Sequence, residues 1–202
     1  MAVKIRVAEP EDAQGLLAIY APFCEASTVS FEIAAPTAAQ MAERLARIVP
    51  QYPWLVCEID SRIAGYVYAS AHRERAAYRW AVDVAVYVAD DFRRRGVGRG
   101  LYTSLFTILR NQGYVKALAG ITLPNAGSVG LHEALGFRPV ATYRRIGYKL
   151  GRWLDVGWWE LDLQPAAADP REPRPFAELR AHESMARMLA AGEPLVRSAP
   201  PS

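Results

Sequence analysis

The chain has 202 residues, 51% of them hydrophobic, and a formal net charge of +3. This length fits one domain with a tail, and so mild a charge does not favour nucleic-acid binding. Cys24 and Cys57 show neither metal-ligand nor disulfide spacing, so we expect two buried thiols and no metal site. The N-terminus lacks a signal-type apolar region, and no apolar run is long enough to cross a membrane. We therefore expect a cytoplasmic protein that binds neither membranes nor nucleic acid.

The hydrophobic pattern alternates between the periods of strands and helices along most of the chain. Thr37 is in position to cap the second predicted helix. The predicted strands cover residues 4–7, 54–59, 63–71, 78–88, 115–123, 137–146 and 155–163. The predicted helices cover residues 12–24, 38–48, 101–111 and 125–135. This order predicts an α/β fold whose mixed sheet carries helices on both faces.

The composition changes after residue 164, where four prolines fall within eleven residues. Such a proline-rich stretch is typical of a linker or tail. We therefore divide the chain into a main domain over residues 1–164 and a tail over residues 165–202. Within the tail we expect a terminal helix over 176–191 and disorder from residue 193 onward.

A basic, glycine-containing loop over residues 93–99 joins the strand ending at Val88 to the next helix. Arginines are unfavourable at a helix N-terminus, which already carries partial positive charge, so their presence there indicates a bound anion. The loop has neither the Walker spacing nor the dinucleotide-binding spacing of glycines. A solvated basic turn is the alternative interpretation, and a nucleic-acid contact is the least favoured.

Asp83 lies inside an otherwise apolar strand, a few residues before this loop. A carboxylate in such a place is costly unless it is paired or functional. One interpretation is a structural ion pair with Arg75 or Arg79. The other, which we favour slightly because of the loop that follows, is a base close to a reacting centre.

Asn125 is a good N-cap for the helix that follows it. From that start, Asn125, Ser128 and His132 lie on one side of the helix at spacings of three and four residues. A lone histidine is most often a surface or hydrogen-bonded residue, but this polar stripe raises the case for a functional imidazole.

The run from Arg93 to Gly98 resembles the pyrophosphate loop of the GNAT superfamily of acyl-CoA N-acyltransferases. The run from Asn125 to Phe137 resembles the second motif of that superfamily. Further stretches resemble the phosphinothricin N-acetyltransferases within it, and the resemblance extends over about residues 3–163. These stretches are residues 27–31 (STVSF), 52–56 (YPWLV), 63–65 (IAG), 78–80 (YRW), 86–88 (VYV), 131–137 (LHEALGF) and 155–159 (DVGWW).

The resemblance implies the GNAT fold, a splayed mixed sheet with acetyl-CoA as cosubstrate and no metal. An amine would attack the thioester directly, with Asp83 as base where the family has glutamate, and with His132 donating a proton to the thiolate or orienting the thioester. The implied cosubstrate-binding residues are Val86, Tyr87, Val88, Arg93, Arg94, Arg95, Gly96, Val97, Gly98, Arg99, Asn125 and Ser128. The implied acceptor-binding residues are Phe31, Arg73, Arg75, Tyr78 and Arg79, although the arginines are equally well explained as surface charge.

From the resemblance we expect an amino-acid N-acetyltransferase whose acceptor is of the phosphinothricin, methionine sulfone or methionine sulfoximine type. We also expect a homodimer. Two alternatives stay open. The enzyme acetylates other amines or protein N-termini, or the chain is a catalytically silent acyl-CoA-binding module.

Overall fold

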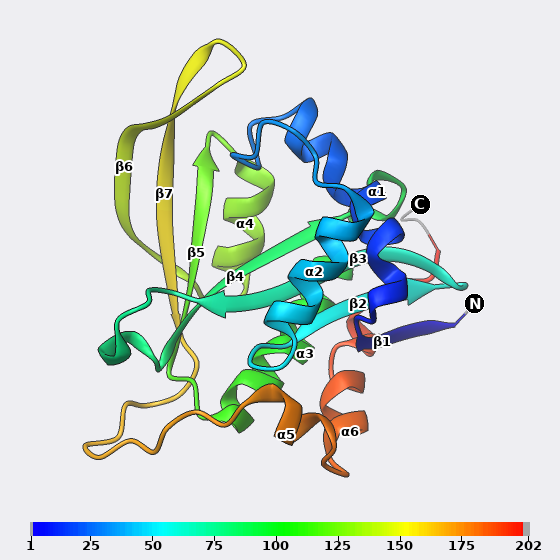
Figure 1. The fold of residues 1–202 in the computed structure, drawn as a ribbon, viewed down its shortest axis with the longest axis vertical. Coiled ribbons are helices and arrows are strands. Elements are labelled where there is room, and N and C mark those ends of the chain that lie inside the picture. Colours follow the sequence, from blue (N-terminus) through cyan, green and yellow to red (C-terminus); the bar gives the residue numbers. More distant parts are fainter. Residues whose placement is uncertain (1, 200–202) are drawn as a thin grey trace.

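The computed structural model describes residues 2–199, which form a seven-stranded sheet with helices on both faces (Figure 1). The strand order is β1-β2-β3-β4-β5-β7-β6, and only the β4–β5 contact is parallel. The strands are β1 Val3–Val7, β2 Trp54–Ile59, β3 Arg62–Ala71, β4 Ala81–Val88, β5 Lys116–Leu123, β6 Arg138–Lys149 and β7 Arg152–Asp162. The mixed α/β fold expected from the sequence is confirmed.

Two hydrophobic cores cover the two faces of the sheet, because successive side chains of a strand point to opposite faces. Helices α1 (Ala13–Glu25) and α2 (Ala38–Ile48) pack on one face, over Trp54, Val56 and Tyr66. Helix α3 (Val97–Gln112) packs on the other, over Leu55 and the neighbouring inward side chains. Helix α4 (Ala126–Ala134) adds its partly buried apolar side chains to the α3 side.

Helix α2 has the predicted limits, and the predicted cap at its start is confirmed. The Thr37 hydroxyl accepts a hydrogen bond from the backbone N–H of Gln40, and the Gln40 side chain accepts one from the backbone N–H of Thr37. Helix α3 begins four residues earlier than predicted, because Gly96 adopts a left-handed conformation that starts the helix inside the basic loop. The predicted strand over 78–88 begins at Ala81, and the loop expected between residues 147 and 154 is mostly hairpin strand.

The tail is more ordered than the sequence predicts. In place of one helix over 176–191 it forms α5 (Phe176–Arg180) and α6 (Met185–Ala190), and Glu193–Leu195 forms a 3-10 turn where we expected disorder. The helix breaks where Nδ1 of His182 contacts both the backbone N–H and the hydroxyl of Ser184, a local bond that competes with helical pairing.

Apolar side chains of the tail complete the core on the α3 face. Phe176, Leu179, Met185, Met188 and Val196 are all buried there. The expected division of the chain at residue 164 stays a prediction, and the expected disorder at residues 200–202 lies outside the described residues. Within residues 2–199, no helix is long and apolar enough to cross a membrane.

Candidate active site

Strands β4 and β5 separate after a short paired stretch. They pair only from Ala81 to Asp83 on β4 and from Lys116 to Leu118 on β5. On its other edge β4 stays paired with β3 as far as Val88. Residues 84–88 of β4 therefore keep one backbone edge free of sheet pairing, facing the gap that opens toward β5.

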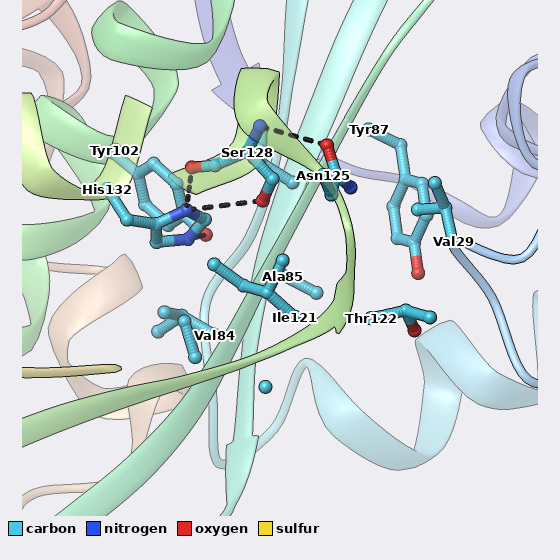
Figure 2. Close-up of a pocket in the computed structure, with 13 residues that line it drawn as sticks. Val29, Val84, Ala85, Tyr87, Tyr102, Ile121, Thr122, Asn125, Ser128 and His132 are labelled. Atoms are coloured by element: carbon cyan, nitrogen blue, oxygen red, sulfur yellow. Dashed lines mark hydrogen bonds between the residues drawn. The ribbon is translucent and has the colours of Figure 1, made fainter. Parts of the chain in front are cut away.

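A small cavity of about 60 Å³ lies in this gap, between the two strands and α4 (Figure 2). The strands line it mostly with apolar side chains, together with Tyr87 and Thr122, and the helix lines it with polar ones. The lining residues are Val29, Val84, Ala85, Val86, Tyr87, Tyr102, Ala119, Gly120, Ile121, Thr122, Asn125, Ser128 and His132. The polar stripe predicted on the helix thus faces the cavity.

Asn125 caps α4 as predicted, since its Oδ1 accepts a hydrogen bond from the backbone N–H of Ser128 at 3.1 Å. His132 is only 3% exposed. Its Nδ1 lies 2.8 Å from the carbonyl oxygen of Ser128, and its Nε2 lies 2.9 Å from the hydroxyl of Tyr102 on α3 (Figure 2). A carbonyl only accepts, so Nδ1 carries the proton and, in the neutral ring, Nε2 accepts the hydrogen of Tyr102.

Burial keeps this pair uncharged. Desolvation lowers the pKa of His132, opposed in part by the hydrogen bond to the Ser128 backbone. Desolvation also raises the pKa of the fully buried Tyr102 phenol. Of the two ordinary interpretations of His132, the surface residue is wrong and the hydrogen-bonded residue agrees with the structure. At neutral pH the ring is a neutral acceptor toward Tyr102.

A larger groove of about 540 Å³ continues from the cavity toward the basic loop. It is lined by Val86, Tyr87 and Val88 from β4, by Asn125 and Ser128 from α4, and by Arg93, Arg94, Gly96, Val97, Gly98 and Arg99 from the loop and the start of α3. The first bond of α3 runs from the N–H of Gly100 to the carbonyl of Gly96, so the preceding N–H groups lack helical partners. These donors and three arginines make the end of the groove at the basic loop suitable for binding an anion.

The fourth arginine lies elsewhere. Arg95 is 8% exposed, stacks on the ring of Phe92, and donates from Nε to the carbonyl of Arg197 in the tail. It does not line the groove. Of the other three, Arg93 also pairs with Asp90 at 2.7 Å.

Asp83 lies at the last paired position of β4, where the strands begin to separate. Its partner is neither Arg75 nor Arg79, as the structural interpretation expected, but His72, whose Nδ1 lies 2.7 Å from its Oδ1. Desolvation raises the pKa of Asp83, while the hydrogen bond and charge of His72 and the charge of Arg73 oppose the rise. The carboxylate is 30% exposed, so it is accessible to a substrate.

Asp83 and His132 approach the gap from opposite faces of the sheet. Val82 and Val84 belong to the core under α3, so Asp83 between them points to the α1–α2 face. Helix α4 carries His132 on the α3 face, against Tyr102. A substrate bound in the gap between β4 and β5 would therefore have Asp83 on one side and His132 on the other.

Three of the five predicted acceptor residues gather beside Asp83. Arg73, Arg75 and Tyr78 line a hollow together with His72. Arg79 does not, because it forms an ion pair with Glu172 of the tail. The ring of Phe31 lies against Gly147 of β6, and it is 42% exposed.

A further hollow of about 390 Å³ lies on the same face as Asp83, and the sequence analysis did not single it out. Tyr68 and Ser70 on β3 line it, directly opposite Ala85 and Asp83 on β4. Its rim carries the ion pair between Arg44 and Glu32 at 2.7 Å.

Comparison with known proteins identifies the family. A model of the acetyltransferase (GNAT) domain matches residues 5–158. The chain belongs to the GNAT acetyltransferase family. The phosphinothricin N-acetyltransferase of Streptomyces viridochromogenes is 40% identical over 88% of this chain and 96% of its own length.

Two further relatives match this chain over nearly their whole length. The L-methionine sulfoximine/L-methionine sulfone acetyltransferase of Pseudomonas paraeruginosa is 35% identical over 84% of this GNAT chain and 100% of its own. A phosphinothricin acetyltransferase from Sinorhizobium meliloti, crystallised with acetyl-CoA, superposes with a TM-score of 0.81 at 31% identity, covering 85% of this chain and 95% of its own. The family and enzyme class inferred from the sequence motifs are confirmed.

Two residues of this GNAT site were missed by the sequence analysis. His72 directly follows β3, which pairs with β4 so that Ser70 faces Asp83, and that register was the signal available in the sequence. Tyr102 gave no such signal, because its contact with His132 joins two helices 30 residues apart. No group of three or more His, Cys, Asp or Glu side chains within residues 2–199 is placed to hold a metal ion.

Proposed function

We propose that this GNAT enzyme transfers the acetyl group of acetyl-CoA to the amino group of a small anionic amino acid. The acceptor class is that of phosphinothricin, methionine sulfoximine and methionine sulfone, after the names of its relatives. The observation that carries the proposal is the gap between β4 and β5, which runs from Asp83 past Tyr102 to the basic loop.

The groove fits an extended, anionic cosubstrate. The backbone edge of residues 84–88 offers hydrogen bonds to the amides of a pantetheine arm, and Asn125 and Ser128 lie across from it. The N–H groups at the start of α3, with Arg93, Arg94 and Arg99, would bind the pyrophosphate. Arg95 is outside this proposal, because its side chain binds the tail.

Acetyl-CoA supplies the thioester, and this chain supplies the base. An amino-acid amine is mostly protonated at neutral pH, so a group must take its proton before it attacks the carbonyl carbon. Asp83 is positioned for that role directly or through a water molecule, and burial raises its pKa toward the working range. His72 holds the carboxylate in place through Nδ1. No metal is needed for this chemistry.

Tyr102 lines the cavity on the other face, and its hydroxyl is bonded to Nε2 of His132. Because the ring proton on Nδ1 is already bonded to Ser128, we assign His132 to positioning rather than to proton donation. The hydrogen of the Tyr102 hydroxyl is bonded to Nε2 of His132, so we assign the pair to positioning of the thioester, and the departing thiolate takes its proton from water.

The acceptor's negative charges would be met beside Asp83 by Arg73 and Arg75, with Tyr78 completing the hollow. We keep Phe31 on the acceptor side because its ring is exposed and Val29, two residues before it, lines the cavity. Arg79 is omitted, since its guanidinium is held by Glu172.

A panel of acceptors tests the proposal. The enzyme is incubated with acetyl-CoA and phosphinothricin, methionine sulfone, methionine sulfoximine, unmodified amino acids or short peptides, and free thiol is followed. We expect turnover with the first three. Turnover only with peptides or other amines would favour the alternative acceptor class, and CoA binding without turnover would favour a silent binding module.

We also propose that the enzyme is a homodimer that works in the cytoplasm. An exposed apolar edge on β6 and β7 supports self-association, and two buried free thiols, Cys24 and Cys57, fit a reducing compartment. The proposed partners are small molecules, not nucleic acids or membranes.

A further inference from the structure

The C-terminal segment (residues 192–197) lies directly behind the basic loop (residues 93–99). The backbone N–H of Arg197 donates to the carbonyl of Arg95 at 2.8 Å, and Nε of Arg95 donates to the carbonyl of Arg197 at 3.2 Å. The loop is thus bonded to the tail on one side and lines the groove on the other.

Glycines permit this close approach. A Cβ on Gly96 would collide with the carbonyl oxygen of Leu195, and Gly96 also has a positive φ of 81°. A Cβ on Gly100 would lie 2.7 Å from the carbonyl oxygen of Gly192 and 2.6 Å from Cγ2 of Val196. In the other direction, a Cβ on Gly192 would collide with the carbonyl oxygen of Gly100. Gly96 of the basic loop and Gly100 in the first turn of α3 therefore permit backbone contact with the tail.

The C-terminal segment is itself anchored at several points. The fully buried hydroxyl of Ser104 on α3 donates to the carbonyl of Leu189 at 2.6 Å and accepts from the N–H of Gly192 at 3.1 Å. The carboxylate of Glu193 accepts from the N–H of Ile5 on β1 at 2.9 Å. Val196 is buried in the core under α3.

These anchors fix the position of the loop from behind. Arg94 and Gly96 both have positive φ, so the loop backbone has a conformation that most residues avoid. The contacts with Leu195 and Arg197 hold it in that conformation, in which Gly96 and the first residues of α3 line the groove.

We propose that residues 192–197 are a positioning element for the cosubstrate, which holds the basic loop in the geometry that binds the pyrophosphate of acetyl-CoA. The family match ends at residue 158, so this element belongs to the part of the chain beyond the matched domain. The inference rests on the proposed function, because it assigns the pyrophosphate to the basic loop. A segment that only adds to global stability is the competing explanation.

Two variants and two acyl donors separate these explanations. One variant ends at residue 191. The other is Gly192→Ala, which forces the tail away from Gly100 but keeps every other side chain. The matched control is Gly130→Ala, because a Cβ at Gly130 meets nothing within 4 Å. The donors are acetyl-CoA and S-acetylpantetheine, which lacks the pyrophosphate.

We expect both variants to raise the Kd of CoA about tenfold, equivalent to about 1.4 kcal/mol, as measured by calorimetry. Their kcat/KM with S-acetylpantetheine should stay at the wild-type value, while kcat/KM with acetyl-CoA falls. The control should match wild type with both donors. Circular dichroism and thermal unfolding establish whether each variant is folded. If the shortened chain does not fold, the test rests on Gly192→Ala alone.

Two outcomes would overturn the inference: an unchanged Kd for CoA in folded Gly192→Ala, or an equal loss with both donors. Failure of the wild-type enzyme to bind CoA would instead refute the proposed function.

Discussion

At the scale of residues, Asp83 and His72 form the unit that accepts the proton in our account. The N–H of His72 stabilises the ionised carboxylate and so holds down a pKa that burial raises. His72→Ala removes that bond, so the pKa of Asp83 rises further and a higher pH is needed to ionise it. The acid limb of kcat/KM should therefore move to higher pH in a pH–rate profile.

His72→Gln keeps an N–H donor, so it should restore part of the wild-type profile. An acid limb that stays in place in His72→Ala would show that His72 does not act on the base.

Tyr102 and His132 form the corresponding unit on the other face. Tyr102→Phe removes the hydroxyl bonded to Nε2 of His132 and should lower kcat about tenfold, because the ring loses the hydrogen bond that holds it beside the thioester. His132→Ala should lower kcat by a similar factor, and the double variant should be no worse than the worse single variant. The loss should be the same with acyl donors whose thiol is more acidic, because neither group gives a proton to the sulfur.

A loss that shrinks as the thiol becomes more acidic would instead show proton donation to the sulfur, contrary to this account. Additive losses in the double variant would separate Tyr102 from His132.

At the scale of elements, local signals explain what the sequence predicted well. Helix α2 has a capping box at Thr37, and strand β2 is bounded by Pro53 and by the turn at Asp60, so both match their predicted limits. The tail differs from its prediction. Its helix break depends on the bond between His182 and Ser184, and its order depends on burial of its apolar side chains against α3.

Long-range contacts likewise explain what the sequence could not predict about the site. Arg95 shares the charge and loop of its neighbours, and its contacts with Phe92 and Arg197 direct it away from the groove. The composition of the loop predicted an anion site, but it could not tell which arginines face it.

Gly98 gives a test of the groove at the scale of one element. A Cβ there would lie 3.0 Å from Cδ2 of Leu131, so the larger side chain of Gly98→Val would project between Val88 and Leu131 into the groove. We expect a markedly higher Kd for acetyl-CoA, measured by calorimetry, with the circular dichroism spectrum preserved and Gly130→Ala as control. An unchanged Kd for acetyl-CoA in Gly98→Val would show that acetyl-CoA does not bind in this groove.

At the scale of the whole molecule, the hairpin of β6 and β7 extends beyond the rest of the sheet and leaves β6 as an edge strand (Figure 1). Exposed edges with apolar side chains favour association. The exposed apolar side chains of this hairpin are Val140, Tyr143, Ile146, Tyr148, Leu150 and Trp153. We therefore expect a second copy of the chain to cover this edge.

Trp153→Glu places a charge on the β7 strand of that hairpin, where the native side chain is 61% exposed. Light scattering coupled to gel filtration should give a dimer for wild type and a monomer for the variant. A monomeric wild-type enzyme would contradict the proposal, as would a variant that stays dimeric.

The central claim is that one reaction centre spans the gap between β4 and β5, with Asp83 as its base. The most direct test is kcat for Asp83→Ala as a function of pH, alongside the Kd of acetyl-CoA. We predict a large loss of turnover at neutral pH, nearly unchanged acetyl-CoA affinity, and partial recovery at high pH, where the amine loses its proton unaided. A wild-type rate at neutral pH would contradict the account, because it would leave Asp83 with a structural role only.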